Sequence, residues 1–295
     1  MEGAVKRVAV VGGVNVDICG HSSGKILLRD SNLGSVTLEC GGVGRNIAHD
    51  LRLLGLEVSL VAAIGGDSNA RLITDSCEAL GIDLSLALFA PDRSCSTYLY
   101  VTDDRGDMLV GINDMSITSL ITPEYLLSVM DALNGFDAVV IDANLDRAAV
   151  DTLAAHCTVP MYADPVSVAK CHALDGILPK LRAIKPNEYE AEALTGERDM
   201  EKAAEELISA GVEKVFISAG SSGMYAAEKG MSVQMPRVKA NVVNTTGAGD
   251  SATAAIVYAD LHGMSLEQTV SLAQRAGALT CECEETNSPR LKELI

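Results

Sequence analysis

Short apolar runs alternate with segments of helical periodicity along most of the chain, and this alternation limits the folds open to it. We expect buried strands in the runs RVAVV, EVSLVAAIGG, DAVVID, VPMYAD, LRAIKP and EKVFISAG. We expect helices at about residues 44–54, 69–80, 147–156, 187–195, 200–210, 248–262 and 266–282, with a hairpin across 222–235. Strands that alternate with helices build a parallel sheet that is covered on both faces. The sequence therefore predicts an α/β fold with a doubly wound, mostly parallel sheet sandwiched by helices.

Two polar stretches interrupt the alternation, at about residues 15–40 and 94–114. In the second stretch Tyr98, Tyr100 and Thr102 alternate with apolar residues before a DDRGD turn, which predicts a hairpin. We expect the two stretches to form a small β-sheet that covers a site as a lid, although a surface hairpin without a role is the alternative. Residues 1–295 would then form one domain with a small β lid. The exposed edges of such a sheet also favour a homodimer through the lid.

The charge balance excludes two classes of partner. The 295 residues include 23 basic and 40 acidic side chains, a formal net charge of −17, whereas nucleic acid and anionic membranes attract positive charge. No apolar run approaches the roughly 20 residues that span a bilayer. The eight cysteines form no C-x-x-C pair and no signal peptide precedes them, so we expect free thiols in the cytoplasm. The roles of Cys281 and Cys283 stay open, with a metal site as one alternative.

The stretch NTTGAGDSATAAIV, residues 244–257, places Gly247, Ala248 and Gly249 directly before Asp250 and an apolar run. The N–H groups at the start of a helix lack internal partners and lie at the positive end of its dipole. Small residues let an anion approach these groups closely. The three residues therefore predict an anion hole, meaning a set of N–H donors that binds a phosphate group.

Asp250 is unsuited to plain phosphate binding because its carboxylate repels the ligand. A carboxylate beside a phosphoryl group can instead remove the proton from an attacking hydroxyl, as a general base. The N–H donors would stabilise the charge that grows on the transferred group. The alternative is an ordinary glycine-rich helix start with an acidic residue in its first turn. The combination of base and donors favours a phosphotransferase.

Two longer patterns indicate a family. Residues 244–257 resemble the C-terminal signature of the PfkB, or ribokinase-like, carbohydrate kinases, and residues 41–65, GGVGRNIAHDLRLLGLEVSLVAAIG, resemble the N-terminal one. The resemblance implies a ribokinase-like fold, a kinase that uses ATP and Mg²⁺, and a small sugar or nucleoside as substrate. The shorter strings GGVNVDI, GGVGRNIA, INDM and ADPVSVAK resemble pseudouridine kinases within that family. They imply phosphorylation of the 5′-hydroxyl of pseudouridine.

The resemblance also implies roles for individual residues. It places the general base at Asp250 and the anion-hole amides at Gly247, Ala248 and Gly249. It implies substrate contacts at Asn15, Asp17, Gly41, Gly42, Asn46, Asn113 and Asp114. It implies nucleotide contacts at Asn187, Ser218, Gly220, Gly247 and Gly249, and a magnesium contact, directly or through water, at Glu190. These types suit the ligands, because carboxylates and amides bind hydroxyls and Mg²⁺ prefers oxygen.

The chain departs from the family pattern at a few positions. Asn244 stands where many members have Asp, which leaves dependence on K⁺ uncertain, and Val166 replaces the Asn of a D-P-N motif. Arg45 and Lys170 receive no role. Two alternatives to a pseudouridine kinase remain. The first is a ribokinase or another nucleoside kinase, and the second is a sugar-binding sensor without catalysis on the same fold.

Overall fold

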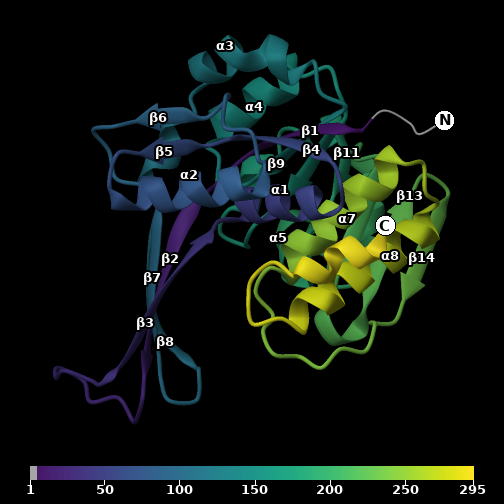
Figure 1. Ribbon diagram of the computed structural model, residues 1–295. Coiled ribbons are helices and arrows are strands. Elements are labelled where there is room, and N and C mark those ends of the chain that lie inside the picture. The colour runs from purple at the N-terminus through teal and green to yellow at the C-terminus, as the bar shows by residue number, and fades with distance from the viewer. Residues whose placement is uncertain (1–4) are drawn as a thin grey trace.

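The computed structural model describes residues 5–295, and its centre is a sheet of eight strands (Figure 1). In spatial order the strands are β14 (Met231–Met235), β13 (Met224–Glu228), β12 (Lys214–Ser218), β11 (Leu181–Ile184), β10 (Met161–Asp164), β9 (Ala138–Asp142), β1 (Arg7–Val11) and β4 (Glu57–Val61). The strands from β12 to β4 pair in parallel, and β13 pairs antiparallel with both β12 and β14. The predicted mostly parallel sheet is confirmed; residues 1–4 of the predicted domain lie outside the described residues.

Helices cover both faces of this sheet because successive side chains of a strand point to opposite faces. In β1, Val8 and Val10 enter one core, while Ala9 and Val11 enter the other. The first core packs α1 (Val43–Leu53), α2 (Ser68–Leu80), α7 (Ala248–Leu261) and α8 (Leu266–Cys281). The second packs α3 (Pro123–Leu133), α4 (Arg147–His156), α5 (Glu188–Thr195) and α6 (Met200–Ser209). The predicted doubly wound arrangement is therefore confirmed.

Some elements differ from the sequence interpretation. The apolar run expected as one strand at EVSLVAAIGG divides into β4 and β5 (Ala63–Gly65), and β5 leaves the large sheet to pair with β6 (Leu88–Ala90). Helix α3 was not predicted, although Thr122 caps it and Pro123 occupies its first turn. Short 3₁₀ turns lie at η1 (Ser116–Leu120), η2 (Cys171–Leu174), η3 (Leu178–Lys180), η4 (Gly220–Ser222) and η5 (Pro289–Leu294).

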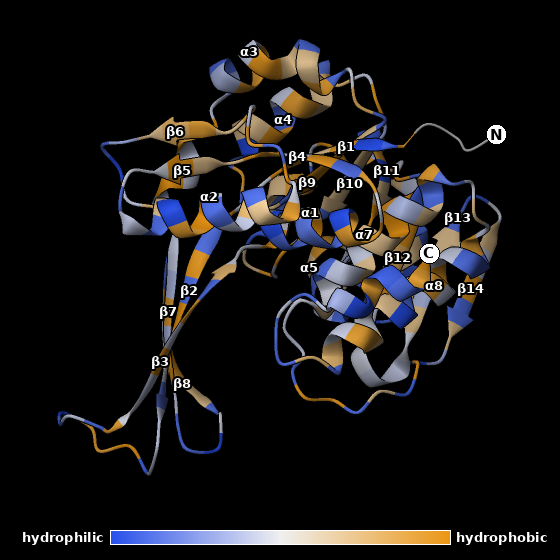
Figure 2. Cartoon of the chain, in the orientation of Figure 1, coloured by the Kyte–Doolittle hydropathy of each residue, from blue (hydrophilic) through white to orange (hydrophobic). Residues whose placement is uncertain are grey.

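A separate sheet of four strands extends away from the body of the molecule (Figure 1). Its order is β3 (Gly34–Gly41), β2 (Asn15–Ser22), β7 (Thr97–Thr102) and β8 (Met108–Asp114). These strands come from the two polar stretches of the sequence, and hydrophobic residues recur along β2 and β8 (Figure 2). We call this sheet the lid sheet; its role as a lid is taken up below as part of the proposed function.

Helix α7 is held at the end remote from Asp250. The Asp260 carboxylate accepts hydrogen bonds from Tyr162 Oη at 2.5 Å, Arg182 Nε at 2.8 Å and Lys214 Nζ at 2.8 Å. Ten residues of helix separate Asp260 from Asp250, a distance of about 15 Å. Asp260 therefore ties the C-terminal end of α7 to β10, β11 and β12.

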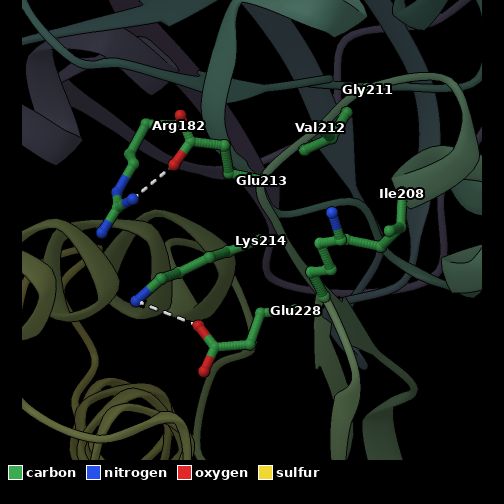
Figure 3. A pocket seen from close by; sticks show the side chains of 8 residues that line it. Arg182, Ile208, Gly211, Val212, Glu213, Lys214 and Glu228 are labelled. Atoms are coloured by element: carbon green, nitrogen blue, oxygen red, sulfur yellow. Dashed lines mark hydrogen bonds and ion pairs between the residues drawn. The ribbon is translucent and has the colours of Figure 1, made fainter.

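A cavity of about 460 Å³ lies beside this ion-pair cluster (Figure 3). In it Arg182 pairs with Glu213, and Lys214 pairs with Glu228 at 3.3 Å. The cavity lies at the amino ends of β11 and β12, whereas sites in open α/β sheets form at the carboxyl ends. Because Arg182 and Lys214 are paired and the cavity lies at the amino ends of the strands, we place the candidate active site elsewhere.

Within residues 5–295, no helix combines the length and the apolar character that a membrane crossing requires.

Candidate active site

The tip of α7 has the backbone geometry that an anion hole requires. Gly247 precedes the helix with φ 80°, in the left-handed region, and a Cβ on it would lie 2.0 Å from the Thr286 carbonyl oxygen. Glycine is therefore required at this position. Regular helical bonding begins with the Ser251 N–H, which donates to the Gly247 carbonyl at 2.9 Å. Among residues 5–295 the N–H groups of Gly249 and Asp250 meet no acceptor, so they are free to bind an anion.

Asp250 lies in the first turn of α7 and is 9% exposed. Its Oδ2 accepts a hydrogen bond from Asn46 Nδ2 at 2.9 Å. Burial and the neighbouring Asp164 carboxylate raise the pKa of Asp250 well above its ordinary value, although Asn46 and Lys185 act in the opposite direction. A carboxylate with a raised pKa is a stronger base. The geometry thus suits the general-base role predicted for Asp250.

A buried polar network holds Asn46 in place. Its Oδ1 accepts a hydrogen bond from Arg45 Nη1 at 3.3 Å, and the same Nη1 donates to Asn287 Oδ1 at 3.0 Å. Asn287 Nδ2 donates to Asp50 Oδ1 at 2.9 Å, and Ser251 Oγ donates to Asp50 Oδ2 at 2.6 Å. The network joins α1 to the C-terminal segment and to α7. Asn46, predicted as a substrate contact, therefore also orients Asp250. Arg45, in turn, holds the Asn46 side chain in place.

A cavity of about 520 Å³ opens beside the tip of α7. It brings together Asn187, Ser218, Gly220 and Gly249, which the family resemblance assigned to the nucleotide, and it is also lined by Ala248. Ala248 was predicted to supply an anion-hole amide, but its N–H donates to the Thr245 carbonyl at 3.4 Å. Gly247, which was also assigned to the nucleotide, does not line the cavity; it is the N-cap residue of α7. Its other walls include the apolar side chains Val238, Val242, Ala252 and Ala273. An apolar cavity with a few polar groups at one end is typical of a site for a cofactor-sized ligand.

Asn187 and Glu190 form a capping box at the start of α5. Asn187 Oδ1 accepts hydrogen bonds from the N–H groups of Tyr189 and Glu190, and Glu190 Oε2 accepts one from the Asn187 N–H at 2.9 Å. Burial raises the pKa of Glu190. Glu190 Oε1 takes no part in the cap. Glu190, the predicted magnesium contact, is 4% exposed and is not among the residues that line the cavity.

The substrate-side residues meet where β2 and β3 join α1. Asn15 Nδ2 donates to Asp17 Oδ1 at 2.6 Å, and a Cβ on Gly41 would lie 2.0 Å from Asp17 Oδ2. Gly42 has φ 97° and lies against the Gly13 carbonyl. The absence of a side chain at Gly41 therefore leaves room for the Asp17 carboxylate, and its absence at Gly42 lets the chain lie against Gly13. Burial raises the pKa of Asp17, with Asn15 opposing the shift.

The two faces of the lid sheet differ in chemistry. The register places Glu39, Asp17, Tyr98 and Asn113 in one row across the four strands, on one face. Tyr98 stacks on Tyr100 of the same face, with ring centroids 5.2 Å apart. Asn113 thus shares the face of Asp17, whereas the resemblance implied substrate contacts at both Asn113 and Asp114. Asp114 is the next residue and lies on the other face, where its Oδ1 accepts a hydrogen bond from the Ser116 N–H at 3.0 Å.

Sequence interpretation missed two residues of the site, Lys185 and Asn287. Lys185 directly follows the buried strand β11, and a charged residue at the carboxyl end of a parallel strand is a recognisable signal. Asn287 lies in a segment without periodicity, so nothing in the sequence connects it with Asp50. Lys170, which received no role, donates from Nζ to Asn144 Oδ1 at 2.5 Å.

Asn244 has both ends of its side chain engaged within the protein. Its Nδ2 donates to the Glu284 carbonyl at 3.1 Å, and its Oδ1 accepts a hydrogen bond from the Thr246 N–H at 3.0 Å. These bonds link the loop before α7 to the segment after α8. Whether a K⁺ ion acts near this residue stays an open prediction.

Comparisons with known proteins identify relatives along nearly the whole chain. The protein-family model described as pfkB family carbohydrate kinase matches residues 5–293 of the chain. A pseudouridine kinase of Escherichia coli (strain K12) is 34% identical over 291 residues, which cover 96% of this chain and 93% of that protein. A carbohydrate kinase from Agrobacterium tumefaciens has a solved structure with a TM-score of 0.88 and 27% identity, covering 98% of this chain and 96% of that one.

A further likeness concerns the fold. The structure of Arabidopsis thaliana ribokinase complexed with ribose and ATP has a TM-score of 0.87 at 21% identity and covers 98% of both chains. With the carbohydrate kinase structure, it confirms the ribokinase-like fold that the sequence predicts.

The Asp50 carboxyl generates a prediction about pH. Burial raises its pKa from 3.8 to about 7, so the folded state keeps a proton that the unfolded chain has already lost. The protonated Asp50 carboxyl therefore contributes most to the free energy of unfolding in acid. This contribution declines by about 1.4 kcal/mol per pH unit as the pH rises from about 4 to about 7. Asp50→Asn cannot ionise and should lack this decline. Urea unfolding at several pH values checks it.

The free energy of unfolding of Asp50→Asn relative to wild type should thus increase between about pH 4 and pH 7 and then level off. The exposed Asp92→Asn serves as the control. A difference that stays constant across this range would contradict the burial effect assigned to Asp50.

Proposed function

The chain belongs to the PfkB family of carbohydrate kinases and is a phosphotransferase, and we propose that it moves the γ-phosphoryl group of ATP to the 5′-hydroxyl of a ribosyl substrate, pseudouridine. The observation that carries this proposal is a buried Asp250 beside free N–H groups at the tip of α7. Gly249 lines the nucleotide cavity, while Asp250 accepts a hydrogen bond from Asn46, one of the substrate-side residues. The arrangement provides a base and an anion hole at one point.

In the proposed reaction the acceptor hydroxyl attacks the γ-phosphorus. Asp250 takes the hydroxyl proton, a new P–O bond forms, and the bond to the β–γ bridging oxygen breaks, so that ADP leaves. The N–H groups of Gly249 and Asp250 donate to oxygens of the phosphoryl group during transfer. Asn46 keeps the Asp250 carboxylate in one orientation throughout. Such positioning and charge stabilisation supply most of the rate in phosphoryl transfer.

The residues present fit a bound Mg²⁺. Within residues 5–295 no three Cys, His, Asp or Glu side chains are grouped to hold a metal ion. Mg²⁺ in kinases needs no such group, because it binds through one or two carboxylates, waters and substrate phosphates. Glu190, which is buried beside Asn187 and Lys185, would hold it directly or through water. When bound, the ion would neutralise charge on the phosphates.

The substrate assignment rests on similarity and on the lid sheet. The E. coli pseudouridine kinase shares 34% identity with this chain, and the polar face of the lid sheet presents Asp17, Asn113 and the stacked Tyr98 and Tyr100. Carboxylate and amide groups suit ribose hydroxyls, while the tyrosines offer a surface to a flat base. We place this sheet as a lid over the substrate. A ribokinase or another nucleoside kinase is the second candidate.

We also propose a cytoplasmic location and a homodimer. The eight cysteines are all free thiols, which suits a reducing compartment. The outer face of the lid sheet carries two aliphatic rows, Leu38, Ile18, Leu99 and Ile112 in one and Val36, Val101 and Val110 in the other. Leu99 is 42% exposed and Ile112 63% exposed. An apolar face of this kind favours burial against a second copy through a twofold axis.

Asp250→Asn tests the general base. The amide cannot take a proton, so kcat should fall by about 10³-fold while ATP still binds. Steady-state assays and calorimetric nucleotide titration measure the two quantities, with the exposed Asp131→Asn as control. Turnover within a few-fold of wild type in Asp250→Asn would remove the proposed base.

A substrate panel tests the acceptor. Coupled assays of ATP consumption with pseudouridine, uridine, ribose and adenosine should give the highest kcat/KM with pseudouridine. A preference for ribose or adenosine would replace the assignment by the second candidate. Ligand binding without ATP consumption for any acceptor would favour the non-catalytic sensor.

Sedimentation velocity tests the dimer. Wild type should sediment as a dimer at micromolar concentration, and Ile112→Asp should shift it to monomer because a charge is costly in a buried apolar interface. Leu127→Asp, at an exposed leucine of α3, should leave the dimer intact. A wild-type monomer, or an Ile112→Asp dimer, would exclude association through the lid sheet.

A further inference from the structure

Lys185 is a buried cation that the proposed reaction has not yet used. It follows β11, and its backbone N–H continues the pairing with β10 by donating to the Ala163 carbonyl at 3.2 Å. The residue is 5% exposed and yet lines the nucleotide cavity. The cavity is lined by one other cationic side chain, Arg237, which is exposed. Lys185 is therefore the cation that a ligand phosphate would meet inside the cavity.

The ammonium group lies against the anion hole. A Cβ on Gly249 would stand 3.3 Å from Lys185 Nζ, so the missing side chain of Gly249 leaves the space between ammonium and hole open. Any larger residue at this position would lie between the ammonium and the amides of the α7 tip. The geometry thus brings one full positive charge and the free N–H groups of α7 to the same place.

Three carboxylates surround this charge: Asp164, Glu190 and Asp250. Asp164 Oδ2 lies 3.6 Å from Lys185 Nζ, which makes an ion pair but exceeds ordinary hydrogen-bond length. Asp164 is itself held by Thr253 Oγ1 at 2.8 Å and by the Val166 N–H at 2.9 Å. Because an ammonium has three donors, Lys185 keeps donors for a ligand while Asp164 fixes its position.

The protonation state of Lys185 is consistent with this arrangement. Burial lowers its pKa, but Asp164, Glu190 and Asp250 together more than offset burial, so the pKa lies above its ordinary value. The lysine therefore stays charged at neutral pH and does not act as an acid or a base. Its contribution is a fixed positive charge and hydrogen-bond donors.

We propose that Lys185 is a further catalytic residue, whose ammonium donates to a non-bridging oxygen of the γ-phosphoryl group while that group moves from ATP to the acceptor. The proposal rests on the proposed kinase function. In the step, Lys185 keeps all its protons, Asp250 receives the proton of the acceptor hydroxyl, and the β–γ bridging oxygen leaves with ADP. A charge placed where negative charge develops stabilises the transition state more than the ground state.

The competing role for Lys185 is a structural one, in which it only neutralises the three carboxylates. Lys185→Met removes both roles, so thermal unfolding must accompany every assay. Lys185→Arg keeps the charge and the ion pair with Asp164, and it provides a second variant if Lys185→Met is unstable. Lys180→Met is the matched control, because Lys180 is exposed and lies outside the cavity.

In the assay, Lys185→Met should lower kcat by about 10²- to 10³-fold while KM for the acceptor changes less than about threefold. Lys185→Arg should recover part of the loss, and Lys180→Met should behave as wild type. A kcat of Lys185→Met within threefold of wild type would contradict the proposal, as would an equal loss in Lys180→Met.

A second readout does not depend on turnover or on the identity of the acceptor. ADP with Mg²⁺ and aluminium fluoride imitates the phosphoryl group in transfer, and wild type should bind ADP at least about tenfold more tightly with fluoride than without. Lys185→Met should lose this gain and still bind ADP alone, because ADP lacks the group that Lys185 contacts. Lys185→Arg should keep part of the increase in ADP affinity that fluoride causes.

A fluoride gain that survives in Lys185→Met, or is absent from wild type, would overturn the role of Lys185. This outcome is distinct from a failure of the proposed function, which the substrate panel detects as absence of phosphate transfer. Calorimetric titration of the full-length protein measures the gain.

Discussion

Every group of the proposed site is placed relative to α7, a helix that is buried along most of its length and held at both ends. At one end Asp260 binds Arg182, Lys214 and Tyr162 at the amino ends of the strands. At the other end Asp250 accepts a hydrogen bond from Asn46. Small side chains between them let the helix pack closely in the core. A helix fixed in this way keeps its first turn rigid, and rigid donors need no reorganisation during a reaction.

The site concentrates buried carboxylates in a chain whose net charge is −17, although the proposed ligand is itself an anion. Buried charges are costly unless they are paired or hydrogen-bonded. Lys185 compensates Asp164 and its neighbours, and Asn46 compensates Asp250. The remaining compensation would come with the ligand, through Mg²⁺. A local positive region made of N–H groups and one ammonium thus counters a strongly negative molecule.

Much of the fold could be predicted from the sequence because the apolar runs and helical periods are long. The helix expected at 147–156 forms at those residues. The division between β4 and β5 was not foreseen, because a continuous apolar run does not indicate which sheet each half joins. Within the site, the role of Asp250 follows from the local pattern at 244–257, whereas that of Asn187 follows only from the family resemblance. The contact of Asn46 with Asp250 spans 204 residues, and the link from Asn287 to Asp50 follows no period, so only three-dimensional packing reveals them.

The most direct measurement of the central claim is a crystal structure of the protein with ADP, Mg²⁺, aluminium fluoride and pseudouridine. The fluoride group should lie at the N–H groups of Gly249 and Asp250, with the acceptor hydroxyl about 3 Å from an Asp250 oxygen. Density for the fluoride group away from the tip of α7, or an acceptor hydroxyl beyond reach of Asp250, would contradict it.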